Sequence, residues 1–294
     1  MIWDFLRPKF QNLRALYRYS GLRQQQALLP NCPLLHLAIA SSGPCVQTFI
    51  TKSRNHLVTL TPNSDRVEKR VLVVGASASI GAAICTELTN TYSSVIGTFH
   101  SRPLRFEADN FEARQLNLCD PQSRQDFVQN VGPVDALVML SGIISGYSLK
   151  DYTDERAADL INANLTGLCL FVRDMLPILS SQATLIFMSS IAAERGSFDP
   201  LYAASKGAII PFAKSLATSR ETDINVITLL PGPISGSTMF EEMTAENQQK
   251  HIDQAPRNRI LEAKHLGTIV ADLCGPHWAS ANGAVIRLNG GAYV

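Results

Sequence analysis

The amino-acid sequence predicts an α/β fold: a doubly wound parallel sheet in a single domain with an N-terminal extension. Three observations lead to this prediction. From residue 71 onward, short apolar stretches typical of buried strands alternate with longer stretches typical of helices. Glycine-rich sequence follows the first strand, and small or polar residues follow several others, at the edge where parallel sheets bind ligands. The 294 residues are 46% hydrophobic, which suffices for one core of ordinary size.

Residues 1–70 differ from the rest of the chain and are assigned to the extension. Up to Ser64 the sole acidic residue is Asp4, against seven lysines and arginines. An amphipathic helix ending near Arg23 is one expectation, because acid-poor leaders that contain arginine are typical of organelle transit peptides. The other is an extension without fixed order, or sequence upstream of the true start. The apolar run at residues 34–40 is too short to span a bilayer.

Residues 71–294 are predicted to form one Rossmann-like domain. Strands connected through helices run parallel, so helices cover both faces of the sheet and ligands bind at the carboxyl ends of the strands. The predicted strands are residues 71–74, 94–99, 115–118, 136–140, 185–188, 225–229 and 284–288, and the predicted helices are residues 82–90, 122–130, 154–179, 201–218 and 263–273.

The stretch GASASIG connects the first strand to the first helix. Glycine lets the backbone approach a pyrophosphate closely, and a helix N-terminus offers free N–H groups with a partial positive charge. The glycine spacing differs from the general dinucleotide fingerprint G-x-G-x-x-G. We expect a dinucleotide at this loop, bound by Gly75, Ser77, Ser79, Ile80 and Gly81.

The end of the second strand bears on which dinucleotide binds. An acidic residue at this point binds the ribose 2′-hydroxyl of NAD, and this sequence has His100, Ser101 and Arg102 instead. A guanidinium makes charge-assisted hydrogen bonds to a 2′-phosphate. We therefore expect NADP(H), with NAD(H) less favoured. The alternative is that Arg102 is a solvated loop residue.

Tyr202 and Lys206 are the predicted acid–base pair. They lie one turn apart on the same face of a predicted helix, where an ammonium favours the ionised phenol and lowers its pKa. Ser189 and Ser190 end the preceding strand, and either hydroxyl could share a substrate oxygen with the phenol. Asn164 lies inside a long helical stretch, where asparagine often marks a local irregularity.

With these motifs, residues 71–294 resemble the short-chain dehydrogenase/reductase family, whose pattern joins a glycine-rich loop to a later Tyr-x-x-x-Lys. The resemblance implies that Tyr202 exchanges the proton of the substrate oxygen and that Ser190 binds this oxygen. Lys206 would lower the pKa of the phenol and hold the ribose, and Asn164 would position a water. The second serine of the pair is preferred because the family usually uses it.

The resemblance extends the cofactor site to other strand ends. The chain departs from the family in two places: MLSG at residues 139–142 replaces Asn-Asn-Ala-Gly, and Asn-Leu replaces an aspartate and an apolar residue near the adenine. The additional cofactor contacts that the resemblance implies are Asn117, Leu118, Ser141, Gly142, Tyr202, Lys206, Pro231, Gly232 and Ile234.

Residues 256–260 and 285–294 resemble the 3-oxoacyl-carrier-protein reductase branch of the family, with Asn289 where that branch usually has aspartate. The branch packs its last helix and strand across subunits, which implies a homo-oligomer, and residues 239–257 would be a mobile segment over the substrate. The expected function is NADP(H)-dependent interconversion of a carbonyl and a secondary alcohol, preferably as a 3-oxoacyl ketoreductase. The alternatives are a sugar, polyol or other alcohol dehydrogenase and an NADP-sensing binding module.

Composition restricts partners and compartment. A formal net charge of +1 with 17% charged residues gives no nucleic-acid signature, so we expect a small-molecule substrate, free or carrier-linked. The six cysteines form no C-x-x-C pair or Cys/His cluster, which indicates free thiols in a reducing compartment and no zinc site. A cytoplasmic location is expected, with organelle targeting through residues 1–70 as the alternative.

Overall fold

The computed structural model describes residues 38–41, 47–53, 56–60, 66–104 and 106–293, and the chain divides into two compact units after Pro62. In the first unit, β1 (Ala38–Ser41), β2 (Gln47–Ser53) and β3 (His56–Leu60) form an antiparallel sheet. The helix expected up to Arg23 and most of the apolar run at residues 34–40 lie outside the described residues.

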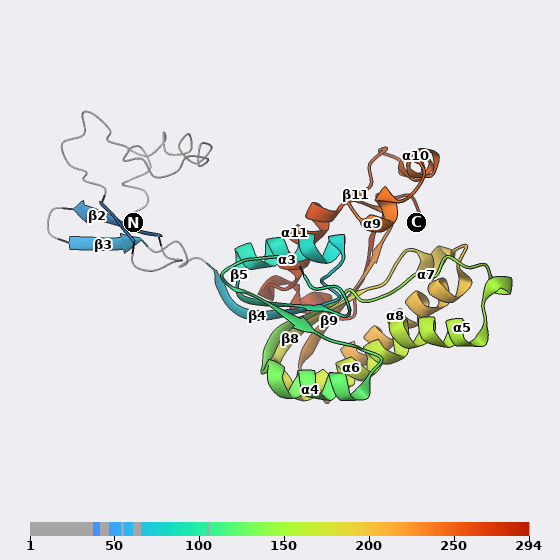
Figure 1. The fold of residues 1–294 in the computed structure, drawn as a ribbon, viewed down its shortest axis with the longest axis horizontal. Coiled ribbons are helices and arrows are strands. Elements are labelled where there is room, and N and C mark those ends of the chain that lie inside the picture. Colours follow the sequence, from blue (N-terminus) through green and yellow to red (C-terminus); the bar gives the residue numbers. More distant parts are fainter. Residues whose placement is uncertain (1–37, 42–46, 54–55, 61–65, 105, 294) are drawn as a thin grey trace. The chain divides into compact units, whose positions relative to one another are not determined.

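The second unit is built on a seven-stranded parallel sheet with helices on both faces (Figure 1), which confirms the predicted doubly wound, Rossmann-like fold. The strand order is β12-β9-β8-β7-β4-β5-β6. The strands are β4 (Val67–Val74), β5 (Tyr92–Phe99), β6 (Phe111–Gln115), β7 (Val134–Met139), β8 (Leu179–Met188), β9 (Ile224–Pro231) and β12 (Val285–Leu288).

Alternate residues of β4 show how one strand serves two cores. Val71 and Val73 pack with buried residues of α3 (Ser79–Thr91) and α11 (Ala263–Leu273) on one face. Leu72 and Val74 pack on the other face with α4 (Pro121–Val131), α6 (Gly167–Met175) and α8 (Pro200–Ala217). These four residues are essentially unexposed, as expected for a central strand of a parallel sheet.

The strand order fixes where a ligand can bind. The chain winds outward from β4 through β5 to β6 and then returns to β7, which pairs with the other side of β4. The N–H of Leu140 donates to the carbonyl of Val74 at 2.9 Å, so the loops that follow β4 and β7 begin side by side. This reversal of winding direction is the position at which open parallel sheets hold their ligands.

Two of the predicted elements differ in the structure. The strand predicted at residues 115–118 is wrong, since β6 ends at Gln115. The prediction failed because this edge strand is exposed and lacks the apolar pattern that marks a buried strand. The helix predicted at residues 154–179 is divided into α5 (Asp154–Ile161), a π-helical turn (Asn162–Thr166), α6 and a 3-10 turn (Leu176–Ile178). The segment predicted to be mobile, residues 239–257, contains α10 (Ala245–Gln254) and all but the first residue of α9 (Thr238–Glu241), and its mobility stays a prediction.

Shorter elements complete the second unit: β10 (Ile234–Ser235), β11 (Leu261–Glu262), α7 (Ala192–Arg195) and 3-10 turns at Leu149–Asp151 and Pro276–Ala281. Among the described residues, no helix combines the length and apolarity needed to cross a membrane. The cysteines within the described part of the chain, Cys85, Cys119, Cys169 and Cys274, are all free thiols.

Candidate active site

Lys206 lies at the centre of the candidate site. Its side chain is 4% exposed on α8, and its Nζ donates to the carbonyl of Met188 at 3.0 Å and to that of Ser141 at 3.4 Å. These bonds tie α8 to the carboxyl ends of β8 and β7. Burial lowers the pKa of the Lys206 ammonium to about 8, which brings it close to neutral pH.

Tyr202 lies one turn before Lys206 and is half-buried. Desolvation raises the pKa of its phenol, the negative charge of Asp199 raises the pKa further, and a hydrogen bond with Ser190 lowers it. The stabilising influence on the phenolate therefore comes from Ser190. The ammonium of Lys206, which was expected to supply it, is directed at two carbonyls.

The two serines at the end of β8 have different partners. Ser189 is buried and donates to the carbonyl of Lys206 at 2.7 Å, so its hydroxyl is used to pack the helix on the strand. Ser190 is half-buried, accepts from the N–H of Ala192 at 3.1 Å, and interacts with Tyr202. This arrangement favours Ser190 as the hydroxyl next to the phenol.

Asn164 lies within the π-helical turn, so the local irregularity predicted there is confirmed. Its side chain is 0% exposed and pairs with the backbone of Ile143, accepting from the N–H at 2.7 Å and donating to the carbonyl at 2.8 Å. It also donates to Ser205 on α8 at 3.0 Å. Both amide hydrogens therefore have protein partners, and a water could still use the second lone pair of Oδ1.

The loop after β4 has the shape that a pyrophosphate needs. Gly75 has φ +87°, and a Cβ there would lie 3.0 Å from the backbone nitrogen of Ser141. A Cβ on Gly81 would lie 2.5 Å from the backbone of Ala76, so only glycine lets α3 start this close to the loop. The N-cap of α3, Ala78, provides no side-chain cap, and the first turn has no acidic residue. Its N–H groups are thus suited to an anion.

The remaining residues of this loop differ in exposure. Ser77 is exposed and Ile80 is half-buried. The Oγ of Ser79 accepts from the N–H of Thr238 at 2.9 Å and lies 3.2 Å from its Oγ1. Ser79 therefore joins the loop to the first residue of α9, a contact that the sequence did not predict.

The segment after β5 is open. His100, Ser101 and Arg102 are all exposed, and the contact described there is a hydrogen bond from Gln115 to the carbonyl of His100 at 2.9 Å. These residues follow a different strand from the catalytic candidates, and within the described part of the chain no hydrogen bond or ion pair joins the two groups.

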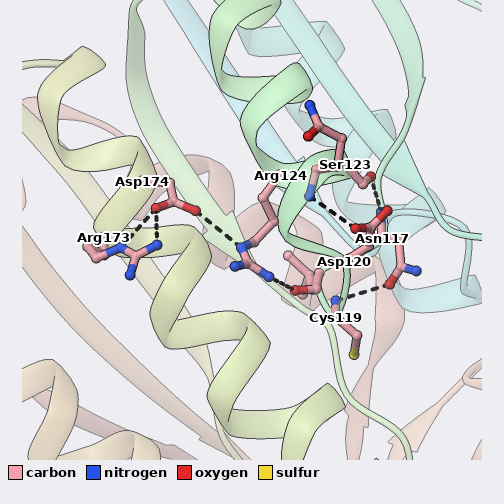
Figure 2. A network of polar contacts seen from close by, with 9 residues as sticks. Asn117, Cys119, Asp120, Ser123, Arg124, Arg173 and Asp174 are labelled. Carbon is pink, nitrogen blue, oxygen red and sulfur yellow. Dashed lines mark hydrogen bonds and ion pairs between the residues drawn. The ribbon is translucent and has the colours of Figure 1, made fainter.

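Figure 2 shows the polar contacts that fasten the segment after β6. The buried guanidinium of Arg124 donates to the carbonyl of Leu118 at 2.7 Å and to Asp174 on α6 at 3.1 Å. The side chain of Asn117 accepts from the N–H of Cys119 at 3.0 Å, which closes a tight turn. Asn117 and Leu118 are thereby fixed by their own chain.

The strand ends near Lys206 complete the site. A Cβ on Gly142 would lie 2.6 Å from the Nζ of Lys206, so the glycine admits the lysine side chain. The carbonyl of Pro231 accepts from Ile191 at 2.9 Å, and the N–H of Gly232 donates to Leu288 at 3.1 Å. Ile234 is buried in β10. The structure thus brings together Lys206, Ser141, Gly142 and Asn164, with Tyr202 and Ser190 beside them.

Sequence reasoning missed Asp199, which is 0% exposed and caps α8 by accepting from the N–H of Tyr202 at 3.0 Å. It also accepts from the hydroxyl of Tyr152 at 2.8 Å. The available signal was the Asp-Pro pair just before the predicted helix, which is typical of a helix start. In the described part of the chain, no group of His, Cys, Asp and Glu residues is arranged to hold a metal ion.

Comparison with known proteins agrees with this geometry. The profile of the family described as short chain dehydrogenase matches residues 69–248. The 3-oxoacyl-acyl-carrier-protein reductase of Vibrio cholerae is 30% identical over 241 residues, which are 77% of this chain and 98% of the relative. The reductase of the same name from Escherichia coli is 29% identical over the same shares of both chains.

Solved structures agree on the fold. A short chain dehydrogenase family protein from Francisella tularensis superposes with a TM-score of 0.68 at 23% identity, covering 77% of this chain and 99% of the other. A short-chain dehydrogenase/reductase from Brucella melitensis, titled glucose/ribitol dehydrogenase, superposes with a TM-score of 0.71 at 23% identity, covering 78% and 98%.

Proposed function

The chain belongs to the short-chain dehydrogenase/reductase family, and from this premise we propose that it reduces a 3-oxoacyl thioester with NADPH. Membership makes it an NAD(P)-dependent oxidoreductase that interconverts carbonyl and alcohol groups. The observation that carries the proposal is the convergence of Tyr202, Ser190, Lys206 and Asn164 at the carboxyl edge of the sheet, next to the glycine loop.

We propose the following division of roles. The nicotinamide, when bound, supplies the hydride. Tyr202 donates the proton to the carbonyl oxygen, and Ser190 donates a hydrogen bond to the same oxygen, polarising it before reaction. Lys206 is held at the carboxyl ends of β7 and β8, where its ammonium would hold the ribose hydroxyls, as the family resemblance implies. Asn164 holds Ile143 and α8 in register and leaves one Oδ1 lone pair for a water.

The dinucleotide would be held by the glycine loop and by strand ends. The free amides at the start of α3 would bind the pyrophosphate, and Gly75 and Gly81 would let it approach closely. Arg102 would pair with the 2′-phosphate, which supports NADPH over NADH. Pro231, Gly232 and Ile234 would border the nicotinamide, as the family resemblance implies.

The proposed substrate class rests on relatives that this chain matches over nearly their full length. These relatives are named as 3-oxoacyl-acyl-carrier-protein reductases. We propose a thioester, free or carrier-linked, and a homo-oligomer. The domain boundary near residue 70 and a reducing, cytoplasmic compartment remain predictions. Sugar, polyol and other alcohol substrates, and NADP sensing without turnover, are outcomes that the following experiment distinguishes.

The experiment follows the absorbance of the reduced nicotinamide with the full-length protein. Acetoacetyl-coenzyme A is offered with NADPH and with NADH, and polyols and aldohexoses are offered with NADP⁺ and NAD⁺, with binding of each dinucleotide measured in parallel. Turnover of the thioester with NADPH above the rate of a Tyr202→Phe variant supports the proposal. Turnover of polyols alone, or dinucleotide binding without turnover of any compound, contradicts it.

A further inference from the structure

A short segment between β7 and α5 is fastened by two buried side chains. Asn164 pairs with both backbone groups of Ile143, as described above. The carboxylate of Asp199 receives the next amides: its Oδ2 accepts from the N–H of Ser145 at 3.1 Å and from that of Gly146 at 3.0 Å. Segment 143–147 is therefore held at its start by Asn164 and at its middle by Asp199.

The other carboxylate oxygen of Asp199 faces the catalytic helix. Oδ1 accepts from the N–H of Tyr202 at 3.0 Å and from the hydroxyl of Tyr152 at 2.8 Å. Tyr152 stacks edge-on against Tyr147, with ring centroids 5.5 Å apart, and the guanidinium of Arg156 lies 4.8 Å from the Tyr147 ring centroid. One carboxylate thus connects the segment, its aromatic border and the first turn of α8.

The carboxylate of Asp199 forms no ion pair with a cationic side chain of the described residues. None of the ion pairs among the described residues involves it, although its side chain is 0% exposed. A buried carboxylate is strongly unfavourable unless hydrogen bonds replace its hydration. Three N–H groups, one hydroxyl and the positive end of α8 supply that replacement. Because the buried carboxylate of Asp199 needs all of these donors to offset its lost hydration, it holds the donor groups in one geometry.

From this arrangement we propose that Asp199 is a positioning residue that fixes segment 143–147 relative to the first turn of α8, the turn that carries Tyr202, where a carbonyl substrate would bind. The inference rests on the proposed function. Segment 143–147 follows β7 at the carboxyl edge of the sheet, directly after Gly142, the glycine that admits the Lys206 side chain. Its first side chain, Ile143, is apolar and 49% exposed.

The charged and titratable groups on the packed elements support a specific effect on Tyr202. On α8 and its cap these are Asp199, Lys206 and the exposed Lys214, and the negative charge of Asp199 raises the pKa of Tyr202. On α7, Glu194 is paired with Arg287, and Arg195 stacks on Tyr293. On α5, Arg156 stacks on Tyr147, while Asp154, Glu155 and Asp159 are exposed. Removal of the Asp199 charge should therefore move the alkaline limb of the rate profile to lower pH.

The test uses Asp199→Asn in the full chain. Asparagine caps helices about as well as aspartate, so α8 keeps its cap. Its amide, however, cannot accept from Tyr202 on one side and from the two loop amides on the other, because one of its ends is a donor. Asp120→Asn is the matched control: Asp120 also caps a helix before a proline, accepting from Gln122 at 3.0 Å, and is exposed.

Two measurements report on the inference. Hydrogen exchange of segment 143–147 does not require activity, and we expect it to accelerate about tenfold or more in Asp199→Asn. The kcat/KM for acetoacetyl-coenzyme A should fall about ten- to a hundredfold, mainly through KM, with NADPH affinity changed less than about threefold. The alkaline limb should move to lower pH. Asp120→Asn should match the unmodified protein in all respects.

A second variant separates the charge from the fastening. Tyr152→Phe removes one hydrogen bond and leaves the carboxylate, so kcat/KM should fall about three- to tenfold without movement of the alkaline limb. Unaltered exchange of segment 143–147 in Asp199→Asn, or an alkaline limb that stays in place there, would overturn the inference. Absence of turnover in the unmodified protein would instead contradict the proposed function, and the exchange comparison would still decide the fastening of the segment.

Discussion

The catalytic edge and the segment after β5 are built in opposite ways. Asn164, Lys206 and Asp199 are buried, and every one of them is bonded to backbone groups of neighbouring elements. His100, Ser101 and Arg102 are exposed. A proton transfer needs donor and acceptor in a fixed geometry before the substrate arrives, so the chain itself holds those groups. The choice between two dinucleotides can be made by a side chain that becomes ordered on the ligand's own phosphate.

The largest effect is expected at the fixed edge. Tyr202→Phe removes the proton donor and leaves the backbone contacts of α8, so kcat should fall about 10²- to 10⁴-fold while NADPH affinity changes little. Steady-state turnover and fluorescence titration with NADPH measure the two quantities. Tyr293→Phe, which loses a hydroxyl bonded to Gln254, serves as the control. Turnover within threefold of the unmodified protein would remove Tyr202 from the mechanism.

The hydrogen bonds of Arg124 to Leu118 and Asp174 test whether the segment after β6, where the adenine is expected, is also held rigidly by the chain. Arg124→Met leaves the Leu118 carbonyl without its donor and weakens the hold on Asp174, which should lower the free energy of unfolding by about 2–4 kcal/mol. Arg173 binds the same carboxylate, but its side chain is 64% exposed, so Arg173→Met should cost less than about 0.5 kcal/mol. Denaturant titrations give both values. Equal losses in the two variants would show that burial of Arg124 contributes nothing.

Burial of Lys206 predicts a pH-dependent stability difference. Its pKa is about 8 in the folded chain against an ordinary 10.5, so between these values the unfolded chain binds more protons. Stability relative to Lys206→Met should therefore rise with pH across that window, by on the order of 3 kcal/mol. Lys214→Met changes an exposed lysine of the same helix and is the control. A difference that stays flat from pH 8 to 10.5 would mean that the ammonium is not destabilised by burial.

The open segment should control cofactor preference and little else. A guanidinium on a 2′-phosphate contributes about 1.5–3 kcal/mol, so the unmodified protein should bind NADPH about ten- to a hundredfold more tightly than NADH. Arg102→Ala should bring the two dissociation constants close together while kcat with saturating NADPH stays within about threefold. Equal affinities in the unmodified protein would make Arg102 a solvated loop residue.

The smallest effect is expected outside both regions. A chain that starts at Asp65 keeps β4 complete, because that strand begins at Val67, so it should fold and retain turnover within about twofold. Expression of soluble protein and the thermal midpoint test the domain boundary. Insoluble protein, or a midpoint lowered by more than about 5 °C, would mean that residues 1–64 take part in folding.

The sequence predicted those parts of the site that follow from local spacing. Tyr202 and Lys206 share a helix face, and Gly75, Gly142 and Ser190 each follow a strand, so periodicity alone placed them at one edge. The irregularity at Asn164 was also predictable, because asparagine is a poor helix former.

What the sequence could not predict depends on tertiary contacts. Two of the partners of Asp199 are the backbone amides of Ser145 and Gly146, which precede it by more than 50 residues, and every residue type except proline supplies such an amide. The same reason explains the missed contact between Ser79 and Thr238. β6 was misplaced because an edge strand needs no continuous apolar run. The direction of the Lys206 ammonium, toward two carbonyls, depends on the folded positions of β7 and β8.

Transfer of a deuterium label from the nicotinamide to a thioester substrate tests the proposed reaction in a single turnover assay. The full-length protein is supplied with acetoacetyl-coenzyme A and NADPH that carries deuterium at the transferable position of the nicotinamide, and the product is examined by mass spectrometry and proton NMR. We expect a 3-hydroxyacyl thioester with one deuterium on the carbinol carbon, formed in equal amount to the oxidised cofactor, and almost none with Tyr202→Phe. Dinucleotide binding without a labelled alcohol, or equal labelling by Tyr202→Phe, would contradict it.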